Sequence, residues 1–357
     1  MYNKGAMNMK FEELQVSSEI ELGKLTIKNR IVRSATHSML GNLDGSISED
    51  ELKMFKDLAE NEVGLIIAGQ FFVSGEATAG PGSNELTHDR HIESASKIME
   101  LVKPFDTKVV AQLNHAGAHA YSQTPYGASE MDLGDGRKAR SITIEEIKRV
   151  KSEFIDAALR AQKSGFHGIQ LHAAHSYLLC EFLKPSINKR QDQYGGDSEN
   201  RFRLIKEIIE GIQEACGDNY PIFIKIDTND LQEQETYNDD LENMMSEFRS
   251  MGIEAVEFSG SEFSGKKFAD HNYFLDRAIE ISKDKGIKTI VVGGVRHFND
   301  MEAILSAGMD MVSICRPFIC EPDFITRLIK GQEKSSCVTC RKCPQAGRDR
   351  CILRVKK

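Results

Sequence analysis

Eight short runs rich in apolar and β-branched residues recur along the chain, and amphipathic helical patterns lie between them. The runs are NRIVRSAT from 29, VGLIIAGQ from 63, KVVAQLNH from 108, GIQLHAAH from 168, IFIKIDT from 222, AVEFSGS from 255, TIVVGGV from 289 and MVSICRP from 311. Strands that are apolar throughout are buried on both faces, as in parallel sheets covered by helices. Eight strand–helix units are what a closed (β/α)8 barrel, or TIM barrel, requires. The sequence therefore predicts an α/β protein built on a single TIM barrel.

The segments between the runs carry apolar residues at the three-and-four spacing of amphipathic helices. Clear examples cover 48–61, 143–165, 200–215 and 298–308. The segment from 143 begins with Thr143 and Glu146 in the register of a capping box and ends at Gly165. An open, doubly wound sheet is the alternative fold, but it would more often carry a G-x-G-x-x-G turn after its first strand, and NRIVRSATHSML has none.

Composition and charge narrow the class of protein. A chain of 357 residues with 40% apolar content buries one large core or two ordinary ones. The net charge of −8, from 46 basic and 54 acidic residues, provides no basic field for nucleic acid. No apolar run approaches the roughly 20 residues of a membrane span, and the start of the chain lacks the apolar centre of a secretory signal. We therefore expect a cytoplasmic protein that binds neither nucleic acid nor membrane.

In a TIM barrel the active site lies at the C-terminal ends of the strands. In this chain those ends carry mainly polar residues: Ser34, Ala35, Thr36 and His37; Gln70; Gln112, Asn114 and His115; His172, His175 and Tyr177; Lys225 and Asp227; Ser259; Gly293 and Gly294; and Cys315 and Arg316. Bare glycine N–H groups beside an arginine suit a phosphate. Each residue alone also has a structural explanation, Tyr177 as a buried tyrosine and the paired glycines as a tight turn. Their meeting at one barrel mouth predicts a functional site that takes a phosphorylated ligand.

Four of the eight cysteines crowd together near the end of the chain, in a stretch without apolar periodicity: Cys337, Cys340, Cys343 and Cys351. Cytosolic thiols are normally reduced, which favours metal binding over disulfides. The C-x2-C-x2-C-P spacing, with a fourth cysteine after seven residues, can ligate a [4Fe–4S] cluster. A structural zinc tetrathiolate and a tail of free thiols are the two alternatives that remain open.

The stretch HAAHSYLLCEFLKPSINKRQDQYGGDSENRFRLIKEII, which begins at His172, resembles the signature of the Old Yellow Enzyme family of FMN-dependent ene-reductases. Further similarity covers LGKLTIKNRIVRSAT, AQLNHAG, VVGGV and CRPFICEPDF. The resemblance implies an FMN-binding barrel over 22–332, an N-terminal segment over 1–21 and a cysteine-rich tail over 333–357. The barrel is also similar to the N-terminal part of 2,4-dienoyl-CoA reductase, in which a cysteine cluster that binds [4Fe–4S] follows the barrel.

The resemblance implies which strand-end residues hold FMN. Lys225 would lie near the flavin N1 and C2 carbonyl, where a cation stabilises the reduced ring. His37 stands near the place of a flavin-tuning threonine or cysteine in relatives, and Gln70 replaces a small residue. The remaining implied FMN contacts are Gly293, Gly294, Cys315 and Arg316 at the phosphate, Ser34, Ala35 and Thr36 along one edge of the ring, and Gln112 at its pyrimidine end.

The resemblance also implies a reaction, in which NAD(P)H reduces FMN and FMN reduces an α,β-unsaturated carbonyl compound, an enone or enoate. His172 and His175 would donate hydrogen bonds to the carbonyl oxygen while hydride passes from flavin N5 to the β-carbon. Tyr177 would protonate the α-carbon. The alternative is an electron-transfer component in which an iron–sulfur tail exchanges electrons with a separate redox partner protein. A homo-oligomer is expected by family analogy.

Overall fold

The computed structural model describes residues 10–261, 266, 269–283, 285–340, 342–343 and 351. Eight parallel strands form its centre: β3 (Ile31–Arg33), β4 (Leu65–Phe72), β6 (Lys108–Asn114), β10 (Ile169–Ala173), β11 (Ile222–Asp227), β12 (Ala255–Ser259), β13 (Lys288–Val292) and β14 (Met311–Ile314). Each strand pairs with the next in chain order, and β14 pairs with β3, so that the sheet closes on itself. This confirms the predicted TIM barrel, and each of the eight predicted runs overlaps one barrel strand.

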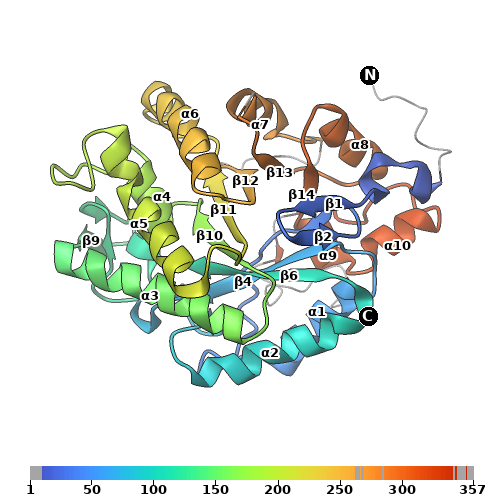
Figure 1. Cartoon of the computed structure of the whole chain (residues 1–357), viewed down its shortest axis with the longest axis horizontal. Coiled ribbons are helices and arrows are strands. Elements are labelled where there is room, and N and C mark those ends of the chain that lie inside the picture. Colours follow the sequence, from blue (N-terminus) through green and yellow to red (C-terminus); the bar gives the residue numbers. More distant parts are fainter. Residues whose placement is uncertain are drawn as a thin grey trace.

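Helices surround the barrel (Figure 1). They are α1 (Glu49–Ala59), α2 (Arg90–Val102), α3 (Ile144–Lys163), α4 (Leu178–Leu183), α5 (Ser198–Cys216), α6 (Gln234–Ser250), α7 (Leu275–Ser282), α8 (Phe298–Ser306), α9 (Arg316–Cys320) and α10 (Phe324–Ile329). The predicted capping box is present at the start of α3, because Thr143 Oγ1 accepts from the Glu146 backbone N at 3.2 Å and Thr143 N donates to the Glu146 carboxylate at 2.9 Å. No described helix is long and apolar enough to cross a membrane.

Shorter elements complete the described chain. A hairpin of β1 (Ile20–Leu22) and β2 (Leu25–Ile27) precedes the barrel, β5 (Asn84–Glu85) extends its sheet beside β4, and a separate sheet contains β7 (Tyr126–Gly127), β8 (Met131–Asp132) and β9 (Lys138–Ser141). Single 3-10 turns cover Phe11–Glu13, Gln15–Ser17, Gly75–Ala77, Lys103–Phe105 and Gly117–His119.

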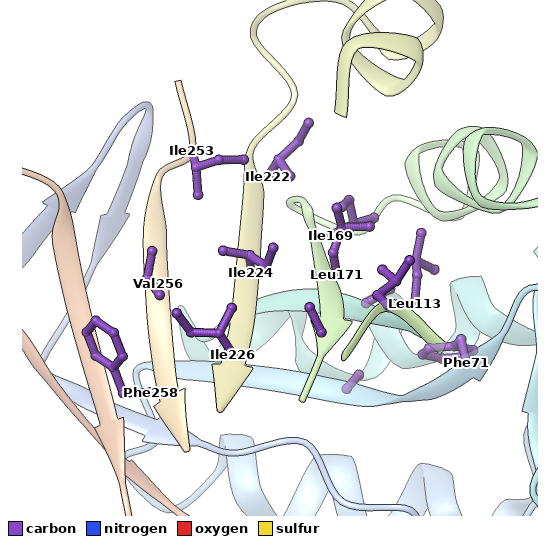
Figure 2. Packing of buried hydrophobic residues seen from close by; sticks show 14 of the residues in the cluster. Phe71, Leu113, Ile169, Leu171, Ile222, Ile224, Ile226, Ile253, Val256 and Phe258 are labelled. Atoms are coloured by element: carbon purple, nitrogen blue, oxygen red, sulfur yellow. The ribbon is translucent and has the colours of Figure 1, made fainter. Parts of the chain in front are cut away.

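Alternate residues of each barrel strand pack on opposite faces. The outer face meets the helices in one large apolar cluster, and Figure 2 shows Ile224 and Ile226 of β11 close to Val256 and Phe258 of β12 in that cluster. A smaller cluster fills the inside of the barrel near the N-terminal ends of the strands, and it contains Ile20, Leu22 and Ile27 of the hairpin with Val32, Leu65, Ile67, Val110, Phe223, Ala255, Ile290 and Met311. The β1–β2 hairpin therefore closes one end of the barrel.

Two residues further along six of the eight strands, the inward positions become polar. The side chains at these six positions are all buried, and they are Ser34, Gln112, Gln170, Lys225, Glu257 and Ser313. We call these six residues the polar layer. It lies between the apolar cluster and the C-terminal mouth of the barrel, and it forms the floor on which the site is built.

Replacing Leu22 with alanine tests the role of the hairpin. Leu22 is fully buried in the inner cluster, so Leu22→Ala should lower the free energy of unfolding by about 3 kcal/mol, measured by denaturant titration. Thr26→Ala, at an exposed position of the same hairpin, should change it by only about 0.5 kcal/mol or less. Equal effects of the two substitutions would contradict this assignment of the hairpin.

Candidate active site

The connection after β10 brings three polar side chains together. His172 belongs to β10, whereas His175 and Tyr177 follow in the turn that leads into α4. The ring centroid of His172 lies 5.2 Å from that of His175 and 5.1 Å from that of Tyr177. The three residues that the sequence placed at one strand end therefore meet at the mouth of the barrel.

The turn itself is held in an unfavourable backbone shape. His175 and Ser176 have left-handed conformations, with φ of 60° and 57°, which cost residues with a Cβ about 1 kcal/mol or more each. The buried Asp227 carboxylate on β11 offsets this cost, because its Oδ1 accepts from the His175 backbone N at 3.2 Å. Lys184 Nζ, 2.7 Å from Asp227 Oδ2, completes a buried ion pair. Strand β11 thus fixes the direction in which His175 points.

Protein atoms surround both histidine rings, and His172 is 1% exposed. Burial, with the nearby charges of His175 and Lys225, holds the pKa of His172 well below its usual range. Burial also lowers the pKa of His175 to about 4. The Nε2 atom of His175 lies 2.8 Å from Ser259 Oγ, while the buried Nδ1 atom of His172 has no hydrogen-bond partner among the described residues. The imidazoles are therefore neutral at physiological pH, and His172 has a ring nitrogen available for a ligand.

Tyr177 is held as a protonated phenol. Burial raises its pKa above the ordinary value, and a hydrogen bond with Gln70 only partly opposes that shift. Gln70 in turn accepts from Asn114 Nδ2 through Oε1 at 2.9 Å. The hydroxyl of Tyr177 is thus a proton donor positioned by the end of β4.

Two further buried polar atoms at the mouth have no partner among the described residues. They are Oε1 of Gln112 and Oδ1 of Asn114, both on β6. Leaving a buried polar atom unpaired costs about 1–3 kcal/mol, so such atoms in a mouth point to a bound polar ligand. Both atoms are hydrogen-bond acceptors, and the imide N–H of the FMN ring is a matching donor.

Lys225 lies on β11 inside the barrel, and it forms an ion pair. Its Nζ lies 3.1 Å from Glu257 Oε1 and 2.9 Å from Ser34 Oγ, and all three side chains are buried. Burial alone would raise the pKa of Glu257, but the charge of Lys225 and three side-chain hydrogen bonds hold that pKa below its usual range. The lysine charge therefore faces a carboxylate charge within the polar layer.

The predicted phosphate residues line one cleft at the ends of β13 and β14. The cleft contains Gly293, Gly294, Cys315 and Arg316, together with Tyr273, Arg296, Cys337 and Thr339. Gly293 and Gly294 have φ of 129° and 77°, and an added Cβ would come within 2.6 Å of the Tyr273 ring at Gly293 and 2.7 Å of the Asn272 backbone at Gly294. Only glycine fits there, which leaves the backbone N–H groups open to an anion. Tyr273 Oη accepts from Arg316 at 3.0 Å and orients it.

The segment from Ser34 to His37 runs beside this cleft. Thr36 Oγ1 lies 3.4 Å from Cys315 Sγ, which joins the end of β3 to the end of β14. His37 Nε2 lies 3.2 Å from Ser83 Oγ, and Ala35 is partly exposed next to Thr36. The predicted FMN contacts therefore lie either in the polar layer, as Ser34, Gln112 and Lys225 do, or at the strand ends above it.

The cysteine-rich tail lies next to the phosphate cleft. Cys337 and Cys351 are buried in a cluster with Cys320 of α9, which the sequence analysis did not include, while Cys340 is exposed and Cys343 half-buried. A zinc tetrathiolate, with Zn–S bonds of about 2.3 Å, holds its sulfurs about 3.8 Å apart. Among the described residues no three cysteine sulfurs lie within 4.8 Å of one another.

One group in the described part of the chain has metal-binding side chains at close range: His271, His297 and Asp300. Asp300 Oδ2 accepts from the backbone N of Arg296 and His297 at the start of α8, and His271 Nδ1 lies 2.8 Å from Oδ1. These bonds already satisfy the carboxylate, so helix capping explains the group.

Sequence reasoning missed several residues that build the site. Glu257 and Gln170 lie within runs that read as apolar strands, yet a charged or amide side chain in a buried strand needs internal partners and could have been flagged for that reason. Tyr273 and Arg296 line the phosphate cleft. Tyr273 lies in a loop that carries no motif, whereas Arg296 directly follows VVGGV and could have been included with its glycines.

The comparisons with known proteins identify the family of the chain. The sequence profile of the NADH:flavin oxidoreductase / NADH oxidase family matches residues 18–335. The NADH oxidase of Thermoanaerobacter brockii is 29% identical over 340 residues, which is 90% of this chain and 52% of that protein. The NADPH dehydrogenase of Bacillus cytotoxicus is 30% identical over 87% of this chain and 90% of its own length. The chain thus spans about half of some curated relatives and nearly all of others.

A solved structure shows the same fold. Old Yellow Enzyme from Pichia sp. AKU4542 superposes with a TM-score of 0.78 at 23% identity, covering 90% of this chain and 88% of that one. The chain therefore belongs to the NADH:flavin oxidoreductase / NADH oxidase family, the family of Old Yellow Enzyme, and is an FMN-binding NAD(P)H oxidoreductase.

Proposed function

We propose that this protein uses NAD(P)H to reduce the carbon–carbon double bond of α,β-unsaturated carbonyl compounds. The observation that carries the proposal is the meeting of His172, His175 and Tyr177 at the barrel mouth. The buried Nδ1 atom of His172 has no hydrogen-bond partner among the described residues. FMN, when bound, supplies the hydride that it has taken from NAD(P)H. Substrate and nicotinamide would use the same mouth in turn.

Different residues around the mouth would bind the phosphate, the ring and the pyrimidine end of FMN. The cleft of Gly293, Gly294 and Arg316 would take the phosphate through backbone N–H groups and a guanidinium charge, with Cys315 at its edge. The segment Ser34, Ala35, Thr36 and His37 would line the ring with Gln70. Gln112 and Lys225 would meet its pyrimidine end from the polar layer.

The two histidines would hold the carbonyl oxygen of the substrate. A neutral imidazole has one N–H, and two such donors aimed at one oxygen stabilise the negative charge that develops there during reduction. Because both imidazoles are neutral before substrate arrives, they act as hydrogen-bond donors that lose no proton. Asp227 and Ser259 keep His175 in place for this role.

Tyr177 would deliver the proton to the α-carbon. Its raised pKa keeps the phenol protonated at neutral pH, and its contact with the ring of His172 places it beside the oxygen-binding pair. Hydride and proton together complete the saturated bond.

A second candidate function rests on the position of the tail. Cys337 and Thr339 line the same cleft as the predicted phosphate residues, so a cluster held by Cys337, Cys340, Cys343 and Cys351 would lie against the flavin site. We propose a [4Fe–4S] cluster there, in a tail over 333–357 that follows a barrel domain over 22–332. The protein would then also exchange electrons with a separate partner protein.

Tyr177→Phe tests the proton donor. Losing a general acid should lower kcat for reduction of 2-cyclohexenone about 100-fold or more, while NAD(P)H reduces the flavin at an unchanged rate in stopped flow. Tyr121→Phe is the matched control, because Tyr121 is 72% exposed. A normal turnover rate in Tyr177→Phe would remove the phenol from the mechanism.

The pH profile tests the histidines. Since the pKa of His175 is lowered to about 4 and that of His172 well below its usual range, both stay neutral as pH falls. We expect kcat for enone reduction to show no histidine titration between about pH 5 and 8. A change of kcat with a midpoint near pH 6.5, the ordinary histidine pKa, would contradict the claim that both imidazoles are neutral if it disappeared in His175→Ala.

Metal analysis of anaerobically purified protein tests the tail. We expect about four irons and matching sulfide per chain, lost in Cys340→Ser. Cys216→Ser, at a half-buried thiol on α5 outside the tail, should retain them. About one zinc per chain would show that the tail forms a structural zinc site and not a cluster. Protein free of both metals would rule out the second candidate function.

A further inference from the structure

We propose that Glu257 is a positioning residue of the flavin site with two effects. Through Lys225 it lowers the reduction potential of bound FMN, and through Gln170 it turns the amide of Gln112 so that an oxygen faces the ring. The inference rests on the flavin being seated as proposed above. It needs no particular substrate.

Glu257 is a fully buried charge in the middle of the polar layer. Its Oε1 accepts from Lys225 Nζ at 3.1 Å, Ser34 Oγ at 2.8 Å and Ser313 Oγ at 2.7 Å. Its Oε2 accepts from Gln170 Nε2 at 3.0 Å. Four donors from four different strands or strand ends converge on one carboxylate, which is therefore ionised and fixed.

An ionised carboxylate only accepts hydrogen bonds, and this fixes the direction of the chain of bonds that starts from it. Gln170 must donate to Glu257 through Nε2, so its Oε1 faces the other way. That oxygen accepts from Gln112 Nε2 at 2.8 Å. Gln112 Oε1 is then the atom left over, and it is the buried oxygen without a partner among the described residues.

The consequence is that the site selects a ligand with an N–H donor. The imide N3–H of FMN is such a donor, and it would bond to Gln112 Oε1. A glutamine alone could present either its N–H2 or its oxygen, because the two ends of the amide have the same shape. The carboxylate of Glu257 on β12 therefore determines which end of the Gln112 amide on β6 faces the ligand.

The same carboxylate also offsets the charge of Lys225. Reduction brings two electrons and one proton to FMN as a hydride, and the ring becomes more negative. A lone buried lysine beneath the ring would favour that state. With Glu257 3.1 Å away, the pair has no net charge, and burial keeps salt from screening it. FMN should therefore be a stronger reductant here than above an unpaired cation.

The test is the midpoint potential of bound FMN, measured anaerobically by equilibration with a reference dye. In Glu257→Gln the side chain keeps its size but loses its charge. We expect the potential to rise by at least the equivalent of a tenfold shift toward reduced flavin, about 30 mV for a two-electron couple. Lys225→Met/Glu257→Gln, in which the pair is again uncharged, should return close to the wild-type potential.

Asp240→Asn is the matched control, because Asp240 forms a buried ion pair with Arg201 between α5 and α6, away from the polar layer. It should leave the potential unchanged. A Glu257→Gln protein with bound FMN at the wild-type potential would overturn the electrostatic effect, as would a double variant that stays as high as the single one.

The affinity for 3-methyl-FMN, which lacks the N3–H donor, tests the orientation of Gln112. Wild-type protein should bind it at least tenfold more weakly than FMN, and Glu257→Gln should reduce that preference because the amide chain can then reverse. Equal affinities in the wild-type protein would overturn the assigned orientation. Failure of apoprotein to bind any FMN would instead contradict the flavin site itself.

Discussion

A closed barrel of eight strands has to fill its own interior, and every second residue of each strand points there. In this protein the interior near the N-terminal ends of the strands is apolar, and the β1–β2 hairpin closes it. Leu22 and Phe223 in this part are 0% exposed. The interior nearer the C-terminal ends of the strands is the polar layer. Buried polar groups are tolerated only when they satisfy one another, so each member of that layer restricts the orientation of the next. The chemistry at the mouth depends on this ordered floor.

Burial has a second effect on the groups that would perform the reaction. It favours the neutral form of each, so the pKa values of His172 and His175 fall while that of Tyr177 rises. Neutral imidazoles and a neutral phenol are hydrogen-bond and proton donors over the whole physiological range. The same removal of water that makes the barrel stable therefore prepares its donors, and the left-handed turn held by Asp227 directs them.

The sequence was sufficient for the barrel and for which residues follow its strand ends, because the hydrophobic period and the position within a strand are local properties. The eight runs and the Thr143 capping box are confirmed. The roles of His172, His175 and Tyr177 remain predictions, although the structure brings the three together. Glu257, Gln170 and Tyr273 were missed because their importance comes from contacts between distant strands and loops. A buried Glu257 acquires its role only when Lys225 and Ser34 surround it, and no local pattern encodes that meeting.

The most direct measurement is the oxidative half-reaction followed by stopped flow without oxygen. Protein loaded with FMN is reduced by one equivalent of NAD(P)H, separated from nicotinamide and mixed with 2-cyclohexenone. We expect the visible absorbance of oxidised flavin to return with one molecule of cyclohexanone formed per flavin. Flavin that accepts electrons from NAD(P)H but stays reduced in the presence of the enone would contradict alkene reduction, and would direct attention to a protein acceptor instead.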